Sequence, residues 1–152
     1  LRTLKPIKNA VPDPIYKMEQ GPPIPPGGER PYSEPMLSDR LKRGFYLTTI
    51  AHCMECHTPM GQRGRDFGGK LGAGGAEFPG PWGVSVSRNI TSSKTSGIGG
   101  WTDEDIKRAI TRGISKDGRK LSPPMGYGYY ANISAVDLNA IIAYLRTVPP
   151  ID

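Results

Sequence analysis

The chain has 152 residues, which is enough for one compact domain and too few for two ordinary ones. Hydrophobic residues make up 36% of it, and 20 glycines and 16 prolines predict that much of the backbone runs in turns and loops. The formal net charge of +6 favours acidic partners. The basic residues are scattered among acidic ones, so the charge pattern argues against nucleic-acid binding.

The beginning of the chain carries no visible targeting segment. No stretch approaches the about 20 consecutive apolar residues that a membrane-spanning helix needs. The first ten residues, LRTLKPIKNA, lack the apolar centre of a signal peptide and do not begin with methionine. We therefore expect a processed or trimmed chain, in which a removed export signal or membrane anchor would no longer be visible.

Residues 1–35 are expected to form an extended arm, with the folded domain in residues 36–152. Their proline density forbids a helix and favours polyproline II segments. These prolines are Pro6, Pro12, Pro14, Pro22, Pro23, Pro25, Pro26, Pro31 and Pro35. Two interpretations stay open: a strap that crosses the domain or reaches a partner, and a tether without specific contacts.

Ser38 is expected to open the first helix, which is predicted to run straight into Cys53. One helical face is marked by residues at spacings of three and four. These residues are Leu37, Leu41, Gly44, Phe45, Thr48 and His52. Glycine in an exposed helix costs about 1 kcal/mol relative to alanine. The position of Gly44 in this face therefore predicts that another helix crosses closely there.

Two more helices are predicted downstream. Thr102 is the expected N-cap of the first, with three acidic residues in the first turn, and Gly113 is its stop. Ser134 is the expected N-cap of the second, with Asp137 in a capping-box position, and residues 149–150, both proline, end it. Their buried faces are expected to be Ile106, Ala109 and Ile110, and Leu138, Ile141, Ile142 and Leu145.

Residues 58–100 are rich in glycine and show no strand alternation. A loop of this length is unusual in a compact domain unless it surrounds something. We therefore expect this segment to pack on a ligand.

Residues 53–57, Cys-Met-Glu-Cys-His, contain both cysteines of the chain and match the C-x-x-C-H signature of c-type haem attachment. Two thiols three residues apart reach the two vinyl groups of one porphyrin, and the imidazole of His57 then lies beneath the iron as proximal ligand. The Nδ1 proton of His57 is expected to meet a backbone carbonyl. Cys53 and Cys56 would become thioethers, and the porphyrin would supply part of the missing core.

Three other interpretations of the motif stay open. A redox disulfide of the thioredoxin kind would follow a strand, whereas a predicted amphipathic helix precedes this motif. A zinc site needs four ligands, and only His52 and His57 are available beside the two thiols. The third interpretation is a chance match.

A second axial ligand is expected far downstream. His52 is too close to the attachment site for the ring to reach, and it is interpreted as an ordinary helix-end residue. Met125 lies in KLSPPMGYGYY, where flanking prolines and glycines form a stiff loop that can present its thioether. A packed core side chain is the other interpretation of Met125. The poorer candidates, in or beside the arm or close to the motif, are Met18, Met36, Met54 and Met60.

Residues 38–149 resemble the class I cytochrome c family, and within it the cytochrome c subunits of periplasmic dehydrogenases for alcohols, sugar acids and related substrates. The resemblance lies in RGFYLTTIAHCMECHTP, RNITSSKTSGIGGWTDEDIKRAITRGISKDGRKLSPPM and ISAVDLNAIIAYLRTVPP. It implies an all-α fold with three main helices around one covalently attached haem c. It also implies that Met125 is the distal ligand and that the first and last helices cross near Gly44 and Tyr144.

The sequence departs from this group at two points. Many of those subunits carry three attachment motifs, whereas this chain has one and is expected to bind one haem. A proline often follows the ligand methionine, whereas Gly126 does here, so the ligand loop is expected to be looser. By resemblance, the Trp101 indole N–H donates to a haem propionate, with core packing as the other interpretation. Arg88 and Asn89 are further propionate candidates.

The expected function is electron transfer without bond chemistry of its own. A methionine and a histidine would fill both axial positions, and the thioether would favour ferrous iron. The expected partners are a periplasmic dehydrogenase as donor and a terminal oxidase or other cytochrome as acceptor. The expected compartment is the bacterial periplasm, with the chain soluble or tethered through a removed anchor. Two alternatives stay open: a permanent cytochrome subunit of a dehydrogenase complex, and a five-coordinate haem enzyme or gas sensor.

Overall fold

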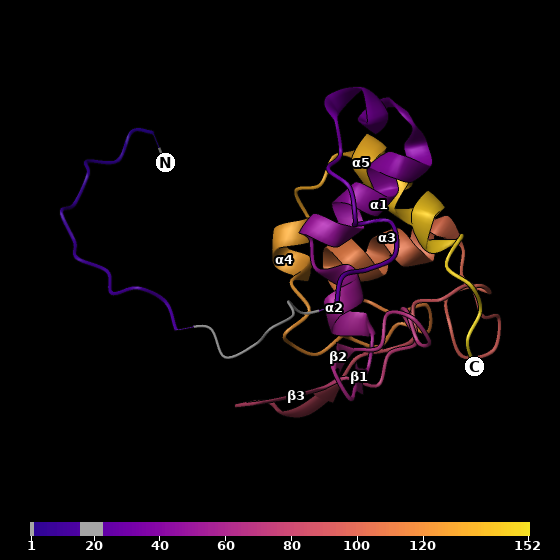
Figure 1. Ribbon diagram of the computed structural model, residues 1–152. Helices are drawn as coiled ribbons and strands as arrows, with labels where there is room; N and C mark the ends of the chain where they lie inside the picture. Colours follow the sequence, from indigo (N-terminus) through magenta and orange to yellow (C-terminus); the bar gives the residue numbers. More distant parts are fainter. Residues whose placement is uncertain (1, 16–22) are drawn as a thin grey trace.

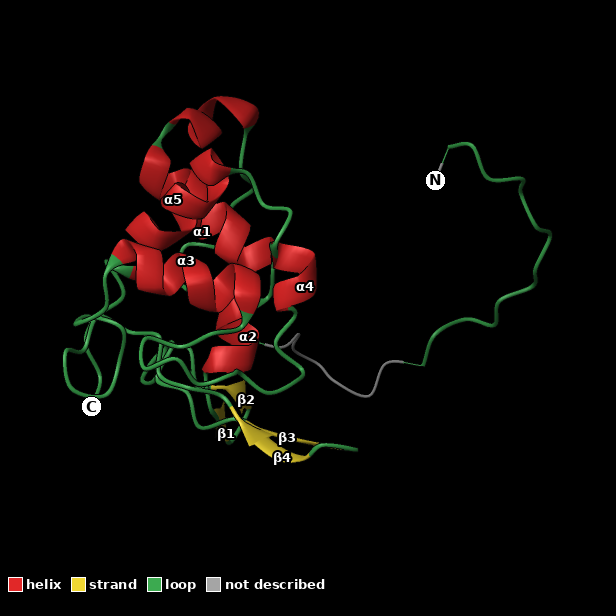
Figure 2. Cartoon of the chain, turned by 180° about the vertical axis from the view of Figure 1, so that it is seen from behind, coloured by secondary structure: helices red, strands yellow, loops and turns green. Residues whose placement is uncertain are grey.

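The computed structural model describes residues 2–15 and 23–152. Three long helices dominate the domain, with shorter helices between them. The strands lie at one end of the domain, below the helices in Figures 1 and 2. The helices are η1 (Glu34–Ser38), α1 (Arg40–Ile50), α2 (Cys53–His57), α3 (Asp103–Arg112), α4 (Tyr127–Tyr130) and α5 (Ala135–Leu145). None of the helices in the described ranges is long and apolar enough to cross a bilayer.

Two small antiparallel hairpins lie in the glycine-rich segment. β1 (Met60–Gly61) pairs with β2 (Gly64–Arg65), and β3 (Glu77–Gly80) pairs with β4 (Gly83–Val86). The described residues are therefore not strictly all-α, although the three main helices expected for the fold are found. Strands of two to four residues are too short to show a period-two pattern in the sequence.

The first helix begins later than predicted. α1 starts at Arg40, and the carboxylate of Asp39 caps it by accepting from the N–H groups of Leu41 and Lys42, both at 2.9 Å. Ser38 instead ends η1, where its hydroxyl donates to the backbone. Serine and aspartate are both good N-caps, so the sequence does not distinguish them.

The predicted continuous helix into Cys53 is also wrong. α1 ends at Ile50, and His52 adopts the left-handed conformation with φ 58° and ψ 25°. This residue redirects the chain into the short helix α2. A left-handed histidine has no periodic signature, so the pattern of apolar residues could not reveal the corner.

The close crossing predicted at Gly44 is confirmed. A Cβ atom on Gly44 would lie 2.1 Å from the Ala140 carbonyl oxygen and 2.8 Å from the Tyr144 Cβ atom. α1 and α5 therefore approach at a distance that only glycine permits. Beside this contact, the Arg43 guanidinium pairs with the Asp137 carboxylate at 2.6 Å.

Both downstream N-cap residues are confirmed, but only Thr102 forms a complete capping box, because the Asp137 carboxylate accepts from the Ser134 hydroxyl and not from its N–H. The Thr102 hydroxyl accepts from the Asp105 N–H at 3.1 Å in a capping box, and the Ser134 hydroxyl accepts from the Asp137 N–H at 3.2 Å. The buried core cluster is Met54, Phe67, Ile98, Ile106, Leu138, Ile141, Ile142, Leu145 and Val148. It contains all four residues predicted for the buried face of α5.

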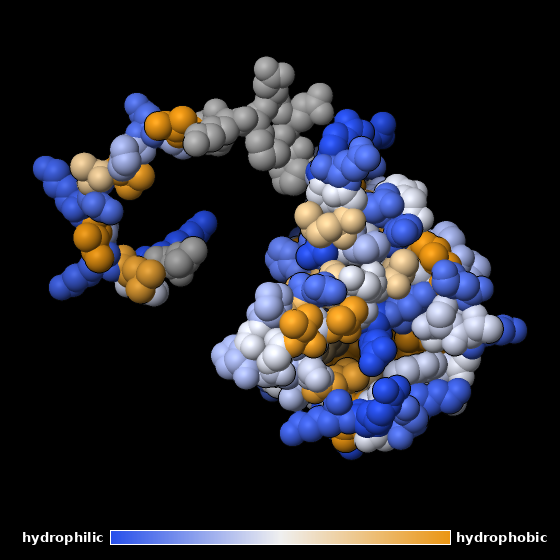
Figure 3. All heavy atoms as spheres, turned by 90° about the horizontal axis from the view of Figure 1, so that it is seen from below, coloured by the Kyte–Doolittle hydropathy of each residue, from blue (hydrophilic) through white to orange (hydrophobic). Residues whose placement is uncertain are grey.

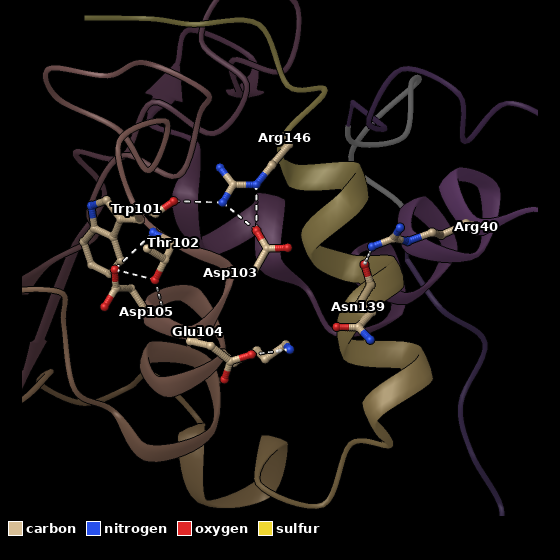
Figure 4. Close-up of polar contacts among 9 residues, drawn as sticks. Arg40, Trp101, Thr102, Asp103, Glu104, Asp105, Asn139 and Arg146 are labelled. Atoms are coloured by element: carbon tan, nitrogen blue, oxygen red, sulfur yellow. Dashed lines mark hydrogen bonds and ion pairs between the residues drawn. The ribbon is translucent and has the colours of Figure 1, made fainter.

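Polar contacts join the ends of α3 and α5 (Figure 4). The Arg146 guanidinium donates to the Asp103 carboxylate at 2.6 Å and to the Trp101 carbonyl at 2.8 Å. On the other side of α5, the Arg40 side chain donates to the Asn139 carbonyl at 3.2 Å (Figure 4). These contacts fix α5 relative to both α1 and the start of α3.

The arm divides into two parts. Residues 2–15 are exposed and extend away from the domain in Figure 1. Further along, Pro25 is buried, and the Tyr32 ring stacks on Phe45 with centroids 5.5 Å apart. Residues 23–33 therefore form a strap against α1, and the arm boundary at residue 35 stays a prediction. Leu1, Met18 and Pro22 lie outside the described residues.

Candidate haem site

The two cysteines lie on the single turn of α2. Both have free thiols, and both residues are half-buried. Met54, between them, is 1% exposed and belongs to the core cluster. The core therefore holds α2 while its two thiols lie three residues apart on one turn.

Burial keeps both thiols protonated. It raises the pKa of Cys53 to about 12, with smaller contributions from the Glu55 carboxylate and the Cys56 thiol. Burial also raises the pKa of Cys56, against the opposing charge of Arg65. Redox cysteine pairs of the thioredoxin kind have lowered thiol pKa values. The raised pKa values therefore disfavour a redox disulfide of the thioredoxin kind here.

His57 is held in the tautomer that an iron ligand needs. Its Nδ1 atom lies 2.6 Å from the Arg88 carbonyl oxygen. A carbonyl oxygen only accepts, so Nδ1 carries the proton and Nε2 has a free lone pair. Burial lowers the pKa of His57, opposed by this hydrogen bond, so the ring is neutral at pH 7. The expected carbonyl contact is found, and Arg88 supplies it.

The backbone around His57 is held from a second side. The Gly74 N–H donates to the His57 carbonyl at 2.7 Å. Gly74 has a φ of +78°, and a Cβ atom there would lie 2.6 Å from the Arg88 carbonyl carbon. A glycine is needed at this position, because any side chain would push away the group that accepts the His57 proton.

The loop that carries Met125 is tied at both ends. On one side, the Leu121 N–H donates to the Gly113 carbonyl at 2.7 Å. On the other, the Tyr130 hydroxyl donates at 2.9 Å to the Ala51 carbonyl, just before the attachment motif. Met125 itself is half-buried. Its role as an iron ligand stays a prediction, and the Tyr130 contact is a link to the motif that the sequence did not reveal.

Trp101 lies at the edge of the core cluster and is half-buried. It lines a cavity of about 350 Å³ together with Lys116, Asp117 and Arg119. Lys116 donates to the Gly100 carbonyl at 2.8 Å. The two cations were missed by the sequence reasoning, because their place beside Trp101 comes from the turn after α3.

Arg88 and Asn89 have other contacts in the structure than those predicted. The Arg88 side chain is exposed, and its backbone carbonyl contacts His57. The Asn89 amide donates to the Ile151 carbonyl at 2.6 Å and to the Ser96 hydroxyl at 3.3 Å. A propionate contact of either residue stays a prediction.

The surface near α2 and the strands suits an apolar ring. Seen from below, this end of the domain is hollowed, and hydrophobic residues gather around the hollow (Figure 3). Two thiols on one helical turn, a neighbouring imidazole with a free Nε2 and an apolar hollow are the groups that a covalently attached haem would use. The residues present therefore fit haem.

The sequence profile of the Cytochrome c family matches residues 41–149. The chain belongs to the cytochrome c family. This membership confirms the class I cytochrome c fold in its coarse outline and the covalent haem c expected from the attachment motif. The matched range contains Cys53, Cys56, His57 and Met125, whose roles at the haem stay predictions.

Three relatives show where in the cytochrome c family the chain lies. The fructose dehydrogenase cytochrome subunit of Gluconobacter japonicus is 42% identical over 113 residues, which are 74% of this chain and 22% of that protein. The gluconate 2-dehydrogenase cytochrome c subunit of Pantoea cypripedii is 38% identical over 112 residues, 73% of this chain and 24% of that protein. The cytochrome c subunit of the quinone alcohol dehydrogenase of Gluconobacter oxydans is 37% identical over 112 residues, which are 73% of this chain and 22% of that protein. This cytochrome c chain thus spans less than a quarter of each of these relatives.

Proposed function

We propose that this chain is a monohaem electron-transfer cytochrome that receives electrons from a dehydrogenase and passes them to an oxidase or another cytochrome. The observation that carries the proposal is the state of His57, a neutral imidazole with Nε2 free, next to two protonated thiols. The single attachment motif supports one haem. The proposed compartment is the bacterial periplasm.

The residues of the site have distinct proposed tasks. Cys53 and Cys56 attach the cofactor, and His57 Nε2 and the Met125 sulfur bind its iron. Haem held in this way supplies a one-electron ferric/ferrous couple. The Met125 thioether favours the ferrous state, whereas the hydrogen bond from His57 to the Arg88 carbonyl raises the basicity of the imidazole and favours the ferric state. With His57 and Met125 both holding the iron, the protein would leave it no open position for a substrate.

Trp101, Lys116 and Arg119 are proposed to face the propionates. Two cations, an indole and the Asp117 carboxylate line one cavity. Arg119 is paired with Asp117 at 2.6 Å, so Lys116 and the Trp101 N–H are the stronger candidates to meet a propionate. Lys116 and Arg119 are exposed, so this arrangement suits carboxylates near the surface.

A dehydrogenase is the proposed electron donor. The three relatives are named as cytochrome subunits of a fructose, a gluconate and an alcohol dehydrogenase. The net charge of +6 suits an acidic partner surface, because such charges steer transient encounters between redox proteins. Those relatives are named as subunits, which also supports a permanent complex in place of a free shuttle. Size-exclusion chromatography of the native complex distinguishes these two arrangements.

The test is an intact-mass measurement and optical spectra of protein purified from its own host. We expect a mass above that of the polypeptide by one haem, and the weak long-wavelength absorption of ferric haem bound to methionine sulfur. Met125→Ala is expected to abolish that absorption while the mass gain stays. Met60→Ala is the matched control, since Met60 is exposed on β1 and is expected to leave the spectrum unchanged. A polypeptide mass without haem would refute the proposed function.

A further inference from the structure

The carbonyl that accepts the His57 proton is followed by an asparagine with four hydrogen bonds. Asn89 Oδ1 accepts from the Thr91 N–H at 2.8 Å and from the Thr91 hydroxyl at 2.6 Å. Asn89 Nδ2 donates to the Ile151 carbonyl at 2.6 Å and to the Ser96 hydroxyl at 3.3 Å. Both N–H groups and both lone pairs of the carboxamide are thus engaged. The orientation of this side chain is therefore fixed.

The loop after Asn89 is closely packed and keeps the partners of the Asn89 side chain in place. Thr91 is 0% exposed and Ser93 is 3% exposed. A Cβ atom on Gly97 would lie 2.4 Å from the Thr91 carbonyl oxygen, and the Ile98 N–H donates to that oxygen at 2.9 Å. The loop therefore cannot shift without breaking close contacts.

Residues 151–152 brace this loop from outside. The Ile151 N–H donates to the Thr91 hydroxyl at 3.3 Å, in addition to the bond that its carbonyl accepts from Asn89. The Asp152 carboxylate accepts three hydrogen bonds from hydroxyls of the loop. Their donors are Ser93, Thr95 and Ser96. Residues 151–152 therefore hold the loop both at Asn89 and at the three hydroxyl residues that follow it.

We propose that Asn89 is a positioning residue for iron ligation, acting through Arg88. This inference rests on the proposed function, because it requires His57 as an iron ligand. Asn89 ties the chain next to Arg88 to the Ile151 carbonyl, which holds the Arg88 carbonyl 2.6 Å from His57 Nδ1. A short hydrogen bond at Nδ1 makes the imidazole a more electron-rich ligand and so stabilises ferric iron. The tether at Asn89 therefore helps to set the reduction potential.

The test compares Asn89→Ala with the wild-type holoprotein. Without the carboxamide, the Arg88 carbonyl moves off the Nδ1 proton, the imidazole becomes less electron-rich and the reduction potential rises. At a fixed ambient potential, the ratio of ferrous to ferric protein is expected to increase about tenfold. Solvent exchange of the His57 Nδ1 proton, followed by NMR of the ferrous protein, is expected to become faster.

Two further variants complete the test. Asn132→Ala removes an equivalent side chain at an exposed position that has no contact with the Asn89 bonds described above, so its potential should match the wild type. Asp152→Ala removes the acceptor for three loop hydroxyls without changing Asn89, and a smaller upward shift is expected. This variant carries the test if Asn89→Ala does not accumulate as holoprotein.

The outcomes separate this inference from the proposed function. A purely structural Asn89 would lower the thermal midpoint and leave the potential and the proton exchange of the folded protein at wild-type values. That result, or an equal shift in Asn132→Ala, would overturn the inference while the proposed function stands. Wild-type protein without covalent haem would remove the proposed function itself.

Discussion

His52 has an unusual backbone for a residue with a side chain. Among the described residues it is the one non-glycine residue with positive φ, and its side chain is exposed. The left-handed conformation costs a non-glycine residue about 1–2 kcal/mol. The turn is nevertheless needed, because it redirects the chain from α1 into the helix that carries both thiols.

Substitution at His52 is expected to follow this backbone cost. His52→Val should lower the free energy of unfolding by about 1–2 kcal/mol, because a β-branched residue is disfavoured in the left-handed region. The free energy of unfolding of His52→Asn should stay close to that of the wild type, since asparagine tolerates the left-handed region. Denaturant unfolding of the holoproteins measures both. Equal stability of the valine and asparagine variants would contradict the explanation.

At the scale of elements, the crossing of α1 and α5 organises the domain. Gly44 permits the close approach, and the Arg43–Asp137 pair lies beside it. The strap adds a second layer, because the Tyr32 ring stacks on Phe45 of α1. The helix that leads to the attachment motif is therefore held from two directions.

Gly44→Ala is expected to separate the two helices. The added methyl group would meet the Ala140 carbonyl oxygen at 2.1 Å, and overpacking of this kind costs about 1–3 kcal/mol. Thermal unfolding of the holoprotein measures the loss. Gly128→Ala is the matched control, because nothing lies within 4 Å of a Cβ atom there, and its stability should be unchanged or slightly higher. A wild-type midpoint for Gly44→Ala would show that the helices can separate freely.

At the scale of the whole molecule, carboxylates join segments that are distant in the sequence. Asp137 joins α5 to α1, and Asp152 joins the last residues to the loop before α3. Hydrogen bonds lower the pKa of both carboxyl groups, first from Ser134 and then from Arg43 for Asp137, and first from Ser93 for Asp152. The folded state thus binds fewer protons than the unfolded state in acid.

Stability is therefore expected to depend on pH with a definite sign. A carboxyl whose pKa is lowered by folding stabilises the protein above its unfolded pKa of about 4, and this stabilisation is lost as the pH falls through the folded pKa. Denaturant unfolding of the holoprotein at a series of acidic pH values measures the loss. Asp137→Asn should make the dependence shallower, and an unchanged slope would show that the Asp137 contacts do not contribute.

The sequence alone determined the features that depend on neighbouring residues. The spacing of Cys53, Cys56 and His57 indicated the cofactor, because covalent attachment is a local geometric requirement. The caps at Thr102 and Ser134 were predicted for the same reason, since a cap and its partners lie within one helical turn. The close crossing at Gly44 was also predicted, although its partner came from family resemblance.

Only the tertiary structure decided the contacts that depend on backbone groups far apart in the chain. The acceptor for His57 lies 31 residues away, and the backbone acceptor for Asn89 lies 62 residues away. Both acceptors are backbone carbonyls, which every residue type carries, so the identity of Arg88 or Ile151 gives no signal. The corner at His52 and the short hairpins likewise follow from how the chain closes around the site. Residue types determined the chemistry of this cytochrome, and the folded backbone determined which groups orient the residues that carry that chemistry.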